Sequence, residues 1–200
     1  MLSIPIYRVY IDDSVDGMNM ISLVKHPAVE TDFLAFSKED KPIESKFEAD
    51  EEQHIVFGCA IRANFLIYRY DNERGEYYVT FDKQTIKDLV EKYAENNYFN
   101  NVNLNHEDNT DGVYLTQMFI KDVENGIDPK GFEEIEDGSL FTAFKVNNDD
   151  VWEKVKSGEF KGFSIETTMK LMEIPSEQKM ASEQPEEEDE IDKIMNEILD

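Results

Sequence analysis

The sequence has few of the side chains that cross-link a chain or hold a metal. It contains a single cysteine, Cys59, and only three histidines, so no disulfide can form within the chain. Cys59 lies in the apolar run 55–61, where a buried and unreactive thiol is expected. His106, Glu107 and Asp108 are adjacent, but no second cluster of histidine or cysteine stands at metal-ligand spacing. We therefore expect neither a metal nor another cofactor.

Positive charge and long apolar runs are also scarce. The chain carries 20 basic against 45 acidic residues, which gives a formal net charge of −25. Such a chain should repel nucleic acid and anionic membranes, and it suits basic partners better. No apolar run approaches the roughly 18 residues that a membrane helix needs, and the start of the chain lacks a signal-peptide pattern. These absences predict a soluble intracellular protein that binds neither nucleic acid nor membrane.

The sequence does contain enough aromatic side chains for one packed core, with thirteen Phe and nine Tyr in 200 residues. Runs rich in β-forming residues predict about eight strands, at 4–11, 54–61, 64–70, 76–81, 102–104, 112–122, 140–146 and 160–171. The turn at 71–75 should join two of them in a hairpin. Amphipathic runs predict two helices, 83–96 capped by Asp82 and 149–157 capped by Asn147 or Asn148. The pattern predicts an α+β fold, a small antiparallel β-barrel or sandwich flanked by helices.

Composition divides the chain into four segments. These are an N-terminal strand and arm at 1–36, a polar linker at 37–53, a folded body at 54–172 and an acidic tail at 173–200. The tail contains the acidic run 186–190, which cannot bury a core and is expected to be disordered. Apolar residues at helical spacing in 191–199 predict a short amphipathic helix, which would need a docking partner to be stable.

The stretch 161–167 has the pattern of a strand that presents a serine. Ser164 is a small polar residue between Phe163 and Ile165, just after a glycine. A serine needs a base to take its proton, and histidine, with an unperturbed pKa of roughly 6.5, suits that task. His106, at the end of a short alternating segment, is the candidate base. Ser164 and His106 are therefore the candidate catalytic pair.

Such a pair also needs a group that orients the histidine. Glu166 lies two residues beyond Ser164, on the same face of a strand, and could do this; Asp108 is the local competitor. His26 is a second candidate catalytic histidine, although a surface or turn position is favoured, and His54 is expected to be an exposed structural residue. A strand serine and a loop histidine without any catalytic role are the alternative interpretation.

An ordered series of segments resembles the prohead (capsid maturation) serine proteases of tailed bacteriophages. The resemblance covers about residues 54–171, and its most specific part is the helix followed by Gly-Phe-Ser. Its segments are Tyr78-Val79-Thr80-Phe81, Asn103-Leu104-Asn105-His106, Asp111-Gly112-Val113-Tyr114, and 151–160 running into Lys161-Gly162-Phe163-Ser164-Ile165. Residues 21–24 and 27–30 also resemble the leader found in some of these phage proteins.

The resemblance implies a fold similar to that of the herpesvirus assemblins and a serine endopeptidase that acts in the host cytoplasm, inside the immature capsid. Its substrates would be the scaffold protein, the major capsid protein and then the enzyme itself, with self-association possible. His106 would be the general base and Ser164 the nucleophile. In the assemblin-like pattern the third member follows the serine on a later strand, but little foldable chain remains beyond Leu171, so Glu166 takes its place here. The alternatives are a non-enzymatic virion or scaffold protein that keeps this fold, and an acidic binding module unrelated to phage.

Overall fold

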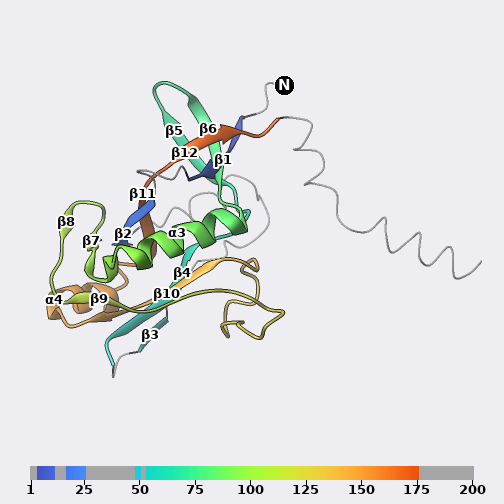
Figure 1. Ribbon diagram of the computed structural model, residues 1–200. Helices are drawn as coiled ribbons and strands as arrows, with labels where there is room; N and C mark the ends of the chain where they lie inside the picture. Colours follow the sequence, from blue (N-terminus) through green and yellow to red (C-terminus); the bar gives the residue numbers. More distant parts are fainter. Residues whose placement is uncertain (1–3, 12–16, 26–47, 51–52, 176–200) are drawn as a thin grey trace, which may run out of the picture.

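The computed structural model describes residues 4–11, 17–25, 48–50 and 53–175 (Figure 1). These residues form twelve strands, two α-helices and one 3-10 helix. The strands are β1 (Ile6–Tyr10), β2 (Gly17–Val24), β3 (Glu48–Asp50), β4 (Ile55–Ile61), β5 (Ile67–Asp71), β6 (Gly75–Thr80), β7 (Val102–Leu104), β8 (Asp108–Asn109), β9 (Val113–Ile120), β10 (Leu140–Val146), β11 (Gly162–Thr168) and β12 (Lys170–Glu173). The helices are α3 (Lys83–Glu95), η1 (Tyr98–Asn100) and α4 (Asp149–Lys156).

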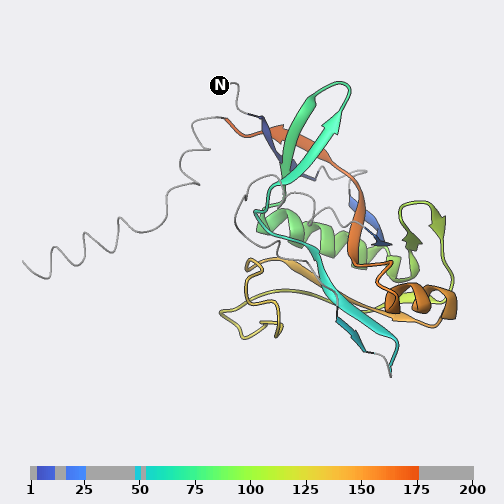
Figure 2. The same ribbon diagram turned by 180° about the vertical axis from the view of Figure 1, so that it is seen from behind.

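The strands form three four-stranded sheets, in the orders β12-β1-β6-β5, β3-β4-β10-β9 and β11-β2-β7-β8. In Figures 1 and 2, α3 crosses the middle of the molecule between the first two sheets. The mixture of sheets and helices confirms the α+β class. The expected antiparallel barrel is wrong in two respects: β1–β6 and β2–β7 pair in parallel, and none of the sheets of the described residues closes. Parallel partners lie far apart in sequence, so local alternation could not reveal them.

Both predicted helices are confirmed, together with their caps. The Asp82 carboxylate accepts a hydrogen bond from Thr85 N at 2.7 Å at the start of α3. Asn148, rather than Asn147, caps α4 by accepting from Val151 N at 3.2 Å. These side chains satisfy amide groups that have no partner within the first turn of a helix. Within the described part of the chain, neither helix has the length and apolar character that crossing a membrane requires.

The predicted hairpin is confirmed as β5–β6, which projects from one end of the molecule in Figure 1. Asp71 organises its turn by accepting backbone hydrogen bonds from Glu73 and Arg74, at 2.9 and 2.7 Å. The backbone hydrogen bond from Arg74 is the main reason that the pKa of Asp71 falls to about 2. Gly75 completes the turn at φ +73°, a conformation that glycine adopts without steric cost.

The N-terminal strands are paired with strands of the predicted body. β1 lies between β12 and β6, and β2 lies between β11 and β7. Most of the predicted linker 37–53 lies outside the described residues, apart from β3 and Gln53. The acidic tail beyond residue 175, its terminal helix and His26 also lie outside them. The boundaries of the four segments therefore stay a prediction.

One face of the β11–β2–β7 sheet belongs to the main hydrophobic core. Phe163, Leu23, Ile21 and Val102 on this face are at most 1% exposed, and they share one cluster with the inward side chains of α3. Because successive side chains on a strand point to opposite faces, the residues between them turn to the other side. That side carries the polar residues of the site.

Two buried cations hold the long connection between β9 and β10. Lys121 donates from Nζ to the Phe132 carbonyl at 2.9 Å and pairs with Asp128 at 2.9 Å. Arg62 pairs with Glu136 through two hydrogen bonds of 2.7 and 2.5 Å, and its side chain is only 4% exposed. Burying a cation without a partner is costly, so these pairs tie the connection to the sheet.

Replacing Glu136 by alanine should therefore destabilise the fold. Breaking a fully buried ion pair costs about 3–5 kcal/mol, and Glu136 is partly exposed, so we expect a loss of about 2 kcal/mol in the free energy of unfolding. Urea denaturation of the full chain measures it. Glu134→Ala, at an exposed position in the same connection, is the control and should change stability by less than about 0.5 kcal/mol. Equal losses in the two variants would contradict the role of the Arg62 pair.

Candidate active site

A row of polar side chains crosses the β11–β2–β7 sheet. Ser164 lies directly opposite Ser22, and Ser22 lies directly opposite Asn103. Residues opposite each other on paired strands share a face of the sheet. Glu166, two residues beyond Ser164 in β11, is on that same face. The row therefore brings two hydroxyls, an amide and a carboxylate to one side of the sheet.

His106 reaches this face from the tight turn between β7 and β8. Asn105 and His106 occupy the two central positions of the turn with φ of 52° and 62°, and Glu107 N donates to the Leu104 carbonyl at 3.1 Å. Positive φ at both positions is the geometry of the type I′ hairpin turn, in which Asn-Gly is favoured. Histidine at the second position carries a steric cost that glycine would avoid. Backbone strain of this kind is found preferentially at functional sites.

The strained turn is held in place by the end of β2. Asn105 N donates to the Leu23 carbonyl at 3.0 Å, and the Asn105 side-chain oxygen accepts from Lys25 N at 3.1 Å. These two bonds fix the backbone immediately before His106. The position of the imidazole is thus determined by β2 as well as by its own hairpin.

The His106 ring contacts a carboxylate and a hydroxyl through the same nitrogen. Nδ1 lies 3.1 Å from Oε1 of Glu166 and 3.1 Å from Oγ of Ser22. Asn103 donates from Nδ2 to the same Glu166 oxygen at 2.5 Å. The His106 and Glu166 side chains are 41% and 35% exposed, so solvent and a substrate can reach them.

Glu166 has the protonation state that a partner of histidine needs. Burial alone would raise its pKa, but hydrogen bonds from Asn103 and His106, with the charge of His106, outweigh burial and lower the pKa of Glu166. The carboxylate is therefore ionised at neutral pH and can only accept hydrogen bonds. The tautomer of His106 that fits is the one with its proton on Nδ1, which leaves the lone pair on Nε2.

The structure brings two of the three predicted site residues into direct contact. His106 and Glu166, 60 residues apart in sequence, are hydrogen-bonded. Ser164 lies on their face of the sheet, but within the described part of the chain the hydroxyl that contacts His106 belongs to Ser22. The exposures of the two serines differ: Ser22 is fully buried and Ser164 is half-buried.

Asp108 and His54 are the other described residues that the sequence analysis considered. The backbone of Asp108 belongs to β8, and its side chain lies outside the described part of the structure. His54, expected to be exposed, is half-buried and stacks on Trp152 with ring centroids 4.5 Å apart. The Trp152 ring in α4 provides the surface on which His54 packs. The polar residues next to His54 in the sequence gave no sign of this contact. No group of three metal-ligating side chains occurs among the residues that the structure describes.

Sequence reasoning missed Ser22 and the role of Asn103. The signal for Ser22 was present, because Ile21-Ser22-Leu23 repeats the apolar-serine-apolar pattern of Phe163-Ser164-Ile165. Only the pairing of β2 with β11 shows that the two serines are neighbours.

A small hollow opens beside Ser164, with a volume of about 40 Å³. Its lining includes Arg62, Phe81 and Met169 as well as Ser164. The Arg62 guanidinium is already held by Glu136, so this part of the wall is fixed. Ser164, which is half-buried, is one of the residues that line this hollow.

A histidine held by a carboxylate, with an accessible serine on the same face, is the type of constellation that serine hydrolases use. Residues 43–173, well over half of the chain, match the family model described as "Putative phage serine protease XkdF". The chain belongs to this family, which confirms the resemblance at the level of a phage serine protease family. No curated protein and no solved structure is significantly similar to it. His106, Ser164 and Glu166 lie inside the matched region, and Ser22 lies outside it.

Because the pKa of Glu166 is lowered, the contribution of this residue to the stability of the fold should depend on pH. A carboxyl whose pKa is lower in the folded than in the unfolded chain stabilises the fold above the unfolded value, about 4.3 for Glu, and this contribution is lost as pH falls through the folded value. We expect wild type to exceed Glu166→Gln in stability at pH 7, and the difference to shrink as pH falls below the unfolded value of about 4.3. Urea midpoints measured from pH 7 to pH 3 test this. A difference that does not change with pH would contradict it.

Proposed function

We propose that this protein is a serine endopeptidase of phage capsid maturation, with Ser164 as nucleophile, His106 as general base and Glu166 as the group that orients the base. The observation that carries the proposal is the His106–Glu166 contact on the sheet face that also presents Ser164. All three residues lie in the region that matches the phage serine protease family.

In the proposed mechanism Ser164 Oγ attacks the carbonyl carbon of the substrate peptide bond while its proton passes to Nε2 of His106. Glu166 keeps the Nδ1 proton in place and stabilises the imidazolium that forms. The histidine then gives the proton to the leaving amine, and an acyl-enzyme remains on Ser164. A water molecule, deprotonated by the same histidine, hydrolyses this ester and restores the serine. Hydrogen bonds between a nucleophile and its base are often long before substrate binds, and they tighten in the complex.

Ser22 is the competing hydroxyl, because it already contacts His106. Its complete burial argues against attack on a peptide bond, since the carbonyl carbon must come within about 3–3.5 Å of the nucleophile. We assign Ser22 the role of a positioning residue that holds the imidazole in place through its contact with Nδ1. Asn103 has the corresponding role for Glu166, to which it donates.

The proposed substrates are the scaffold protein and the major capsid protein of a phage prohead, and finally the enzyme itself. The proposed location is the interior of the immature capsid in the host cytoplasm, where self-association could contribute. The phage family and the resemblance to the prohead proteases support this assignment, and a fold relation to the herpesvirus assemblins is part of the same proposal.

The test combines intact-mass analysis with a serine-directed reagent. The full chain is incubated alone and with the proposed capsid and scaffold substrates, with and without a fluorophosphonate. We expect fragments that the reagent abolishes, and a phosphonyl adduct that peptide mapping places on Ser164. Uncut partners and an unlabelled chain would instead support a structural virion protein that keeps the fold.

A further inference from the structure

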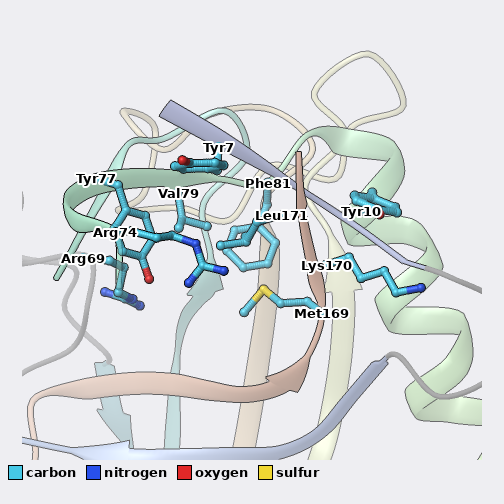
Figure 3. A pocket seen from close by; sticks show the side chains of 10 residues that line it. All are labelled: Tyr7, Tyr10, Arg69, Arg74, Tyr77, Val79, Phe81, Met169, Lys170 and Leu171. Carbon is cyan, nitrogen blue, oxygen red and sulfur yellow. The ribbon is translucent and has the colours of Figure 1, made fainter. Parts of the chain in front are cut away.

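A cavity of about 650 Å³ lies between β1, the β5–β6 hairpin and β12 (Figure 3). It shares Arg69, Phe81 and Met169 with the hollow beside Ser164, so the two spaces adjoin. Lys170, on the far side of the cavity, is six residues beyond Ser164 along β11 and β12. At ~3.3 Å per extended residue this corresponds to at most about 20 Å. The cavity is therefore within reach of a peptide whose scissile bond lies at Ser164.

The charged side chains of the described residues that line this cavity have the sign opposite to the net charge of the chain. Among the described residues that line it, Arg69, Arg74 and Lys170 are cationic and none is acidic, although the chain has 45 acidic and 20 basic residues. Asp71 pairs with Arg74 at 2.8 Å and is not part of the lining. In Figure 3 the two arginines lie on one side of the cavity and Lys170 on the other.

The floor between the cations is apolar. Phe81, Leu171 and Met169 lie there in Figure 3, and the ring of Tyr7 lies above them. An apolar floor can pack against the aliphatic part of a side chain, and guanidinium groups bind its carboxylate with two parallel hydrogen bonds. Glutamate and aspartate combine these two features.

We propose that this cavity is the specificity subsite of the enzyme and that it selects substrates with an acidic side chain within a few residues of the scissile bond. The inference rests on the proposed function, since it assigns the substrate class of the same site. Arg69 lines both the cavity and the hollow beside Ser164. It is therefore the cation that binds the acidic side chain nearest the scissile bond. Because the rest of the chain repels anions, recognition depends on these close contacts and weakens as salt screens them.

Binding tests the subsite without any cleavage. The full-length Ser164→Ala chain is titrated with a fluorescein-labelled peptide of about ten alternating glutamates and alanines, and with its glutamine counterpart, at low salt. We expect the glutamate peptide to bind roughly tenfold more tightly. Arg69→Gln with Arg74→Gln should remove the difference, whereas Lys87→Gln with Lys130→Gln, the same charge change at exposed positions elsewhere, should keep it. Equal affinity of the two peptides for the parent chain, or no binding of either, would overturn the proposal.

Cleavage of a peptide library by the active chain gives the second measurement. The expected result is an excess of Asp and Glu near the cut sites that disappears in the Arg69→Gln, Arg74→Gln variant and persists in the lysine control. Cleavage that depends on Ser164 but shows no acidic preference would overturn the subsite and leave the protease intact. Absence of cleavage would count against the protease alone, because the binding difference does not depend on it.

Discussion

Ser164→Ala should slow peptide-bond cleavage by about 10³-fold or more, whereas Ser22→Ala should slow it by less than about tenfold. The two serines are a matched pair, since they lie opposite each other on β11 and β2 and both stand between apolar neighbours. They differ in exposure: Ser164 is half-buried and lines a hollow, and Ser22 is fully buried against His106. Removing the nucleophile eliminates the acyl-enzyme, but removing a positioning hydroxyl only loosens the base.

The comparison uses kcat/KM on one cleaved peptide, with thermal unfolding of both variants as the control for folding. Ser22→Ala loses a buried hydrogen bond, so we expect it to be less stable by about 1 kcal/mol, while Ser164→Ala should be nearly neutral. If Ser22→Ala proved inactive and folded, with Ser164→Ala active, the nucleophile would be Ser22.

The parts of this fold that the sequence predicts are those decided by neighbouring residues. The helix caps Asp82 and Asn148, the Asp71 turn and the β10 strand all follow from local hydrogen bonding and periodicity. The pairing of β1 with β6 and of β2 with β7 does not, because each joins segments about 70–80 residues apart, and parallel pairing leaves no local turn signal. The predicted all-antiparallel arrangement of the barrel or sandwich failed on these two parallel pairings.

The features of the site likewise divide into those that neighbouring residues decide and those that depend on long-range pairing. That Ser164 and Glu166 share a face was predictable, because side chains alternate along a strand. That His106 would contact Glu166 followed from chemical need and not from spacing, and the contact with Ser22 was not foreseen. β2 also lies outside residues 43–173, yet it forms the middle of the site sheet and anchors the turn at Asn105. A chain that begins at the family boundary would therefore lack part of the site's support.

The strained turn gives a second prediction that separates catalysis from stability. His106→Gly should lower kcat/KM by about 10³-fold or more, because no base remains to take the serine proton. The same change places glycine at φ 62°, where it relieves about 1 kcal/mol of steric cost, and this offsets the lost hydrogen bonds to Ser22 and Glu166. We expect the free energy of unfolding to stay within about 1 kcal/mol of wild type.

His106→Ala is the matched control, because alanine loses the same hydrogen bonds but keeps the Cβ atom in the left-handed conformation. It should be as inactive as His106→Gly. Its free energy of unfolding should be about 1 kcal/mol lower than that of His106→Gly. Added imidazole can occupy the space of the missing ring beside Glu166, so it should restore part of the activity of either variant. Restoration that requires both imidazole and Ser164 would identify His106 as the base, since a purely structural histidine would leave the two variants active and unresponsive to imidazole.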